Sequence, residues 1–189
     1  MNMLFSFNGH HGTSSESAKK IIASNYELSI GNDEWLGNGV YFFVPGISTK
    51  TIELAENWAI AQSWDNENKQ NKYIQYCVIQ SEIEVDESEF LDLTKEEGVE
   101  ILSYLVDRYK DKIKTIGRSM KFQDGLLLNL AREEGIFPLE VVKGNFYIKF
   151  AKERIEKINL RTSNCTICTV YNPSKNILSN SIIKTGQVK

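Results

Sequence analysis

Two short stretches near the start of the chain carry residue types suited to binding a ligand and acting on it. The first is His11-Gly12-Thr13, which offers an imidazole, a hydroxyl and a glycine backbone side by side. The second is Gly37-Asn38-Gly39, followed directly by Val40-Tyr41-Phe42-Phe43. Glycines let a ligand approach the main chain closely, and the aromatic run after them favours a β-strand. The pattern therefore predicts a strand that lines a pocket centred on Tyr41.

These two motifs, in this order, resemble those of the ADP-ribosyltransferases of the diphtheria-toxin and poly(ADP-ribose) polymerase type. In that family the first motif is His-Gly-Thr or His-Gly-Ser on strand one, and the second is Gly-x-Gly-[Ile/Val]-Tyr-Phe entering a strand. A helix with Ala-x-x-aromatic follows, and Ala55-Glu56-Asn57-Trp58 is similar to it, with Trp58 in place of a tyrosine. The resemblance covers about residues 5–60. It implies an α+β fold in which split, mixed or antiparallel sheets and flanking helices surround an NAD-binding cleft.

The resemblance implies that NAD⁺ is the substrate and assigns a role to each matching residue. The residues implied to bind it are His11, Gly12, Thr13, Gly39, Tyr41 and Trp58. His11 would hydrogen-bond a ribose hydroxyl, while the Gly12 backbone and the Thr13 hydroxyl would bind the carboxamide. Tyr41 and Trp58 would hold the cationic pyridinium ring between two aromatic faces. Catalysis would then depend on positioning and on electrostatic stabilisation of the positive charge that develops on the ribose.

The third motif of the family departs from its pattern here. The family usually carries a glutamate at the start of a late strand, before a run such as Tyr-Ile-Val-Tyr-Asp. The run Cys168-Thr169-Val170-Tyr171-Asn172 looks similar, which places Ile167 at the glutamate position, or Thr166 if the register shifts by one. The implied catalytic set is therefore His11, Tyr41 and Ile167, of which Ile167 cannot ionise. The loss implies mono- rather than poly-ADP-ribosylation, and it leaves a non-catalytic NAD-binding module as an alternative.

Other residues could supply the missing carboxylate, and structural roles compete at several positions. The acidic residues considered are Glu82, Glu84, Asp124 and Glu140. Glu82 and Glu84 share one face of an expected strand, where solvation is the simpler role. His11 could instead be satisfied by backbone groups at a strand end, and Trp58 could simply pack against its helix's neighbours. Trp35 and Trp64 are interpreted as packing or rim residues.

The reaction implied is transfer of ADP-ribose from NAD⁺ to one site on a macromolecule, with release of nicotinamide. An NAD glycohydrolase and an RNA 2′-phosphotransferase are alternatives on the same fold, and the latter needs clustered basic residues that are scarce near the two motifs. By family and size the chain also resembles toxins of bacterial toxin–antitoxin and phage-defence systems, which implies an antitoxin protein as a partner. A net charge of −3 favours a protein acceptor over single-stranded nucleic acid, which stays open.

Composition indicates one globular domain over residues 1–189, with 41% hydrophobic and 25% charged residues. No apolar run approaches the roughly 20 residues of a membrane span, and no basic segment of a signal peptide precedes Leu4. We therefore expect a cytoplasmic protein with no membrane partner. The three cysteines, one of them Cys77, are expected to be free thiols. Cys165 and Cys168 match C-x-x-C, but strand residues three apart point to opposite faces, so no metal site is expected.

Hydrophobic periodicity predicts the elements that must position these residues. Strands are expected at 3–8, 39–44, 73–85 and 165–171, and residues 139–142 and 146–150 are expected to form two short strands or one strand and an edge. Helices are expected at 18–23, 49–65, 95–112 and 122–134, loops at 25–38 and 65–72, and a loop or short helical turn at 151–163. Ile177-Leu178 and Ile182-Ile183 could pair at a sheet edge, and the tail is expected to be loose from about residue 184. The irregular order of strands and helices is typical of an α+β fold.

Overall fold

The computed structural model describes residues 3–31, 34–116 and 123–188. Seven strands form one central sheet: β1 (Leu4–Ser14), β2 (Val40–Phe43), β5 (Gln75–Asp86), β6 (Phe90–Asp92), β7 (Val141–Phe146), β8 (Cys165–Val170) and β9 (Ile177–Gln187). Their order is β6-β7-β8-β2-β1-β5-β9, and all neighbours are antiparallel except the parallel pair β6–β7. A small separate antiparallel sheet joins β3 (Trp64–Asp65) and β4 (Gln70–Asn71). The expected α+β class with a mixed sheet is confirmed.

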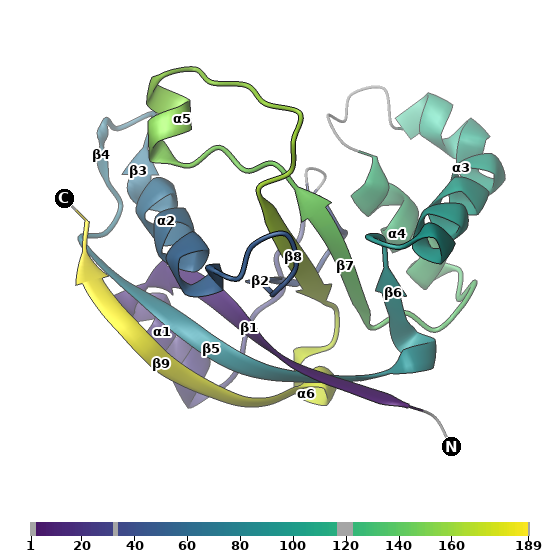
Figure 1. The fold of residues 1–189 in the computed structure, drawn as a ribbon, viewed down its shortest axis with the longest axis horizontal. Coiled ribbons are helices and arrows are strands. Elements are labelled where there is room, and N and C mark those ends of the chain that lie inside the picture. The colour runs from purple at the N-terminus through teal and green to yellow at the C-terminus, as the bar shows by residue number, and fades with distance from the viewer. Residues whose placement is uncertain (1–2, 32–33, 117–122, 189) are drawn as a thin grey trace.

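Helices lie on both faces of the central sheet (Figure 1). They are α1 (Ser15–Ala23), α2 (Thr51–Ser63), α3 (Glu96–Ile116), α4 (Asp124–Glu133), α5 (Ala151–Ile155) and α6 (Pro173–Asn176), with a 3₁₀ turn at Glu87–Glu89. Because strand side chains alternate between faces, the sheet carries two apolar clusters. One contains Ala55 of α2, Leu105 of α3 and Leu128 of α4, and the other contains Ala18 of α1. Burying a leucine side chain completely contributes about 1.5–3 kcal/mol, so these clusters hold the helices on the sheet.

The first strand is longer than its hydrophobic pattern predicts. A strand was expected over 3–8, but β1 pairs with β5 without interruption from Leu4 to Ser14. His11-Gly12-Thr13 therefore lies inside a strand and not after its end. The Ser14 side chain then accepts a 3.0 Å hydrogen bond from the Ser17 N–H and caps α1.

Three further parts of the chain differ in detail from the prediction. The tail is not loose from residue 184, because β9 pairs with the edge of β5 as far as Gln187. Where two short strands or one strand and an edge were expected at 139–142 and 146–150, the structure has one strand, β7, with the bounds Val141–Phe146. Part of the expected loop 65–72 forms the β3–β4 pair. Of the predicted elements, residue 122 of the helix and residues 32–33 of the loop lie outside the described residues.

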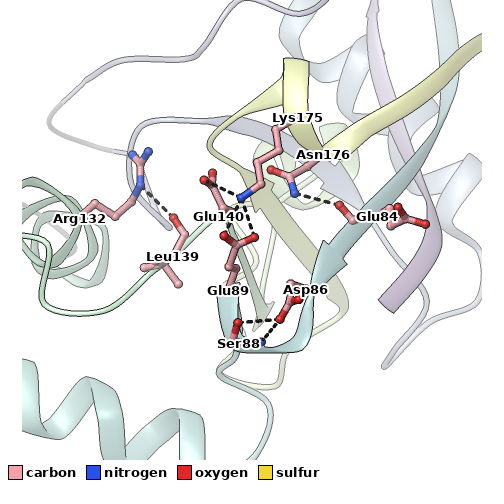
Figure 2. A network of polar contacts seen from close by, with 9 residues as sticks. All are labelled: Glu84, Asp86, Ser88, Glu89, Arg132, Leu139, Glu140, Lys175 and Asn176. Carbon is pink, nitrogen blue, oxygen red and sulfur yellow. Dashed lines mark hydrogen bonds and ion pairs between the residues drawn. The ribbon is translucent and has the colours of Figure 1, made fainter. Parts of the chain in front are cut away.

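A polar network ties α6 to β5, to the turn that follows β5 and to the residue before β7 (Figure 2). The Lys175 ammonium lies 2.6 Å from a Glu89 oxygen and 3.3 Å from a Glu140 oxygen. Next to it, the buried Asn176 amide donates to the Glu84 carbonyl at 2.9 Å. The network holds the turn between β8 and β9 against β5 and the start of β7.

Candidate functional site

The central sheet is split between β1 and β2. Within the described residues the two strands share one paired position, His10 with Phe43. The Val44 N–H donates to the Thr166 carbonyl at 3.1 Å and so points towards β8. Backbone groups alternate along a strand, so those of Tyr41 point the other way, towards β1. If the register continued, Gly12 would face Tyr41, but the ladder ends and a gap opens there.

A cleft of about 820 Å³ occupies this split. Its volume lies within the roughly 300–1,000 Å³ that small-molecule sites usually have. All seven residues singled out from the sequence line it, namely His11, Gly12, Thr13, Gly39, Tyr41, Trp58 and Ile167. They come from β1, the entry to β2, α2 and β8. The fold therefore brings residues near the start of the chain together with Ile167, which lies more than 100 residues later.

The His11 imidazole bridges the two separated strands. Its Nδ1 lies 2.9 Å from the Tyr41 carbonyl oxygen, and because a carbonyl only accepts, Nδ1 carries the proton. Burial is the main influence on this side chain and lowers the pKa of His11 below 6.5. At neutral pH the ring is therefore uncharged, and its Nε2 can accept a hydrogen bond. Edge contacts with Tyr26 and Phe42, at 5.2 and 5.9 Å between ring centroids, hold the ring in place.

The neighbouring histidine has a different environment. His10 is buried, with Nε2 3.3 Å from the Gln80 side-chain oxygen. Burial also lowers its pKa. The two adjacent histidines therefore have separate partners.

Packing alone requires glycine at the motif positions. A Cβ on Gly12 would lie 1.8 Å from the Ala55 carbonyl oxygen of α2, and one on Gly39 would lie 2.3 Å from Thr169 Cγ2 of β8. Gly37 has a φ of +79°, which side chains rarely adopt. The sequence pattern had indicated ligand approach as the reason for glycine. The main chain of Gly12 still faces the gap. Gly12 lies two residues after His10, so its N–H and C=O point to the same edge of β1 as those of His10, which pairs with Phe43.

Three aromatic side chains form a wall of the cleft. The Tyr41 hydroxyl donates to the Gly37 carbonyl at 2.7 Å and accepts from the Leu36 N–H at 2.9 Å, and burial raises its pKa. Trp58 makes an edge contact with Trp35 at 6.2 Å between centroids. Trp35, which was interpreted as a packing or rim residue, both lines the cleft and stacks on Phe146. Tyr41 and Trp58 thus both present rings to the cleft from different elements.

The β8 positions matched to the family's glutamate carry no ionisable group. Ile167 is 3% exposed, sits opposite Phe43 and belongs to the cluster beneath α2. The Thr166 hydroxyl donates to the Asn145 side chain at 2.7 Å and accepts from the Ile47 N–H at 2.9 Å. A shift of register by one residue therefore offers only a hydroxyl that already has two partners.

The four carboxylates considered from the sequence do not line the cleft. Glu140 is bound to Lys175 (Figure 2), and Glu82 accepts from Ser179 at 3.2 Å. The cleft is lined instead by Glu27 and Glu34, from the loop between α1 and β2. That stretch was interpreted only as a polar loop. Its position directly before the Gly-x-Gly motif was the available signal.

The cysteines are three buried free thiols. Cys165 belongs to the cluster beneath α2 and Cys168 to the cluster beneath α1, so they point to opposite faces as predicted. Burial raises the pKa of Cys165 to about 12. In the described ranges no three histidine, cysteine or acidic side chains are placed to hold a metal ion. Across those same ranges, no helix has the length and apolar character needed to cross a membrane.

Comparison with known proteins gives a relative that this chain matches over part of its length. The chain is 34% identical over 88 residues to the uncharacterized protein MJ0359 of Methanocaldococcus jannaschii. The match covers 46% of this chain and 36% of that protein, so the chain spans about a third of its relative. No protein-family profile matches the sequence.

Proposed function

We propose that the protein is an NAD-dependent mono-ADP-ribosyltransferase, which transfers ADP-ribose to a macromolecular acceptor and releases nicotinamide. The observation that carries the proposal is the environment of His11. A neutral imidazole, fixed through Nδ1 to Tyr41, offers Nε2 as an acceptor in a cleft walled by aromatic rings. A ribose hydroxyl beside a flat aromatic cation has the complementary chemistry.

The main chain in the split supports the same substrate. The N–H and C=O of Gly12 face the gap, in register with Tyr41. A carboxamide has one donor and one acceptor group and matches such a pair of backbone groups. Nicotinamide bound there would lie near the rings of Tyr41 and Trp58. Holding the sugar and the base separately orients the bond between them for cleavage.

Binding of NAD⁺ without turnover is the second candidate, and the burial of Ile167 favours it. The strand position where the family carries its glutamate is apolar and belongs to the core. In this case His11 and the aromatic wall would hold the dinucleotide, and no acceptor would be modified. The proposal of a transferase extends to a cytoplasmic toxin of a toxin–antitoxin or phage-defence system, with a protein acceptor and an antitoxin partner.

Labelling of a cell lysate tests the proposal. The purified chain is incubated with lysate and NAD⁺ labelled in its adenosine part, and products are then split by protease or nuclease treatment. We expect labelled macromolecules with the wild type and with Trp64→Ala, an exposed tryptophan outside the cleft. We expect none with His11→Ala or Trp58→Ala. Equal labelling by His11→Ala and the wild type would refute the site.

Labelling and calorimetry together separate the two candidates. Saturable NAD⁺ binding by calorimetry, with neither nicotinamide release nor labelling in any lysate, would establish the non-catalytic module. Nicotinamide release without labelled acceptor would instead identify a glycohydrolase.

A further inference from the structure

We infer that Glu34 supplies the catalytic carboxylate that β8 lacks. The inference rests on the proposed function, since it assigns a further catalytic residue to the same cleft. Glu34 lines that cleft with His11 and Tyr41. It reaches the cleft from the loop before β2, so the carboxylate does not have to come from a strand as it does in the family.

The loop that carries Glu34 is anchored at both ends. Ser29 and Gly39 exchange two backbone hydrogen bonds of 3.0 and 3.1 Å, which close the loop. Its inner end is fixed where the Asn38 N–H donates to the Asn129 side chain of α4 at 2.9 Å. The structure therefore holds Glu34 on a braced turn, as preorganised catalysis needs.

The backbone of Glu34 also packs tightly against α4. A Cβ placed on Gly125, in the first turn of α4, would lie 1.8 Å from the Glu34 carbonyl oxygen. The Gly37 N–H approaches the same oxygen at 3.4 Å. The main chain under the carboxylate thus has little freedom to move away from the cleft.

The carboxylate itself is oriented and keeps free acceptor capacity. The Ser29 hydroxyl donates to Glu34 Oε1 at 2.5 Å. An ionised carboxylate accepts at about four lone-pair positions, so acceptor capacity remains beside the bond from Ser29. Within the described ranges Glu34 forms no ion pair. The Tyr41 phenol lies close enough for the Glu34 charge to add to the raising of its pKa, after burial as the main cause.

The other carboxylate of the cleft is less suited to this role. Glu27 is exposed to solvent. Lys20, the pKa of which is raised mainly by its ion pair with Glu16, receives only a minor contribution from Glu27. Glu27 serves as the matched control for Glu34.

The role of Glu34 follows from the charges in the reaction. The bond between ribose C1′ and the nicotinamide nitrogen breaks, and its electron pair leaves with neutral nicotinamide. Positive charge on the ribose is stabilised by the nearby carboxylate. A lone pair of the acceptor then forms the new bond to C1′, and the proton that the acceptor loses passes to the carboxylate and on to water.

The experiment compares Glu34→Gln, Glu34→Asp and Glu27→Gln with the wild type. Binding is measured by NAD⁺ quenching of tryptophan fluorescence, and turnover by nicotinamide release in lysate. The amide of Glu34→Gln can still accept from Ser29, so the loop is expected to keep its structure. We expect nicotinamide release to fall by about 100-fold or more with Glu34→Gln, as for a lost acid–base group. Glu34→Asp should fall less, Glu27→Gln should stay within about threefold, and all three should bind NAD⁺ like the wild type.

The outcomes separate the two levels of the proposal. If the wild type neither binds nor consumes NAD⁺, the proposed function is wrong and the role of Glu34 fails with it. If the wild type is active and Glu34→Gln is equally active, only the inference about Glu34 is overturned. Loss of NAD⁺ binding in Glu34→Gln would also overturn it, because Glu34 would then be a binding residue and not a catalytic one.

Discussion

Removing the Tyr41 hydroxyl alone should destabilise the fold while leaving the aromatic ring in the cleft. In Tyr41→Phe the Leu36 N–H and the Gly37 carbonyl lose their partner. Each hydrogen bond contributes about 0.5–1.5 kcal/mol net, and more when the abandoned group stays buried. Since Leu36 and Gly37 are both buried, we expect the free energy of unfolding to fall by about 2–3 kcal/mol. At about 2–4 °C per kcal/mol for a chain of this size, Tm should fall by about 4–12 °C.

Urea unfolding followed by circular dichroism measures this change, with Tyr104→Phe as the control. Tyr104 is 52% exposed, and its hydroxyl lies 3.5 Å from an Arg108 nitrogen. Loss of that hydroxyl should change the free energy by less than about 0.5 kcal/mol. If both variants unfold at the same urea concentration with unchanged slopes, the Tyr41 hydroxyl does not hold the 36–37 turn and the reasoning is refuted.

Three further predictions concern pH, close packing and the thiols. Burial lowers the pKa of both His10 and His11, so the unfolded chain takes up protons below pH 6.5 before the folded one does. The free energy of unfolding should therefore decrease as pH falls from 6.5 towards about 5, and His11→Gln should weaken that dependence in urea titrations. Gly12→Ala should cost more than about 3 kcal/mol, because its Cβ would meet the Ala55 carbonyl at 1.8 Å. Gly31→Ala, whose nearest neighbour is 3.7 Å away, should be nearly neutral in the same assay. A thiol reagent should label none of the three cysteines in the native protein and all of them in denaturant, and rapid native labelling would contradict their burial.

Elements with a long, regular pattern could be predicted from the sequence. The helix expected over 95–112 corresponds to α3, and the strand expected over 73–85 corresponds to β5. The full extent of elements set by pairing could not be predicted. The edge pairing expected at Ile177-Leu178 and Ile182-Ile183 is confirmed, but the polar residues of β9 gave no sign that the strand continues along the open edge of β5 as far as Gln187. The same is true of His11-Gly12-Thr13, which β5 holds in extended form.

Some residues of the candidate site could likewise be predicted from the sequence, and others could not. His11 and Tyr41 could be predicted, because each belongs to a short motif that can be recognised without knowledge of the rest of the chain. The fold then brings the strands that carry the two motifs to the same cleft. The reasons for the glycines were not local, since the atoms that exclude a Cβ belong to α2 and β8. Glu34 was missed for the same reason. Its approach to the cleft depends on α4, which lies far along the chain.

The split between β1 and β2 explains why the His11 side chain can stabilise the open end of the sheet and also offer a hydrogen-bond acceptor to the cleft. An antiparallel ladder that continued past His10 and Phe43 would pair the Tyr41 carbonyl with the Gly12 backbone. The His11 side chain takes that carbonyl instead, at 2.9 Å. The bond satisfies an acceptor at the open strand end, fixes the proton on Nδ1 and leaves Nε2 as an acceptor. It also releases the Gly12 backbone groups to face the cleft. The polar groups that the cleft offers to a ligand therefore arise from the interruption of the sheet itself, and a continuous sheet with the same side chains would lack them.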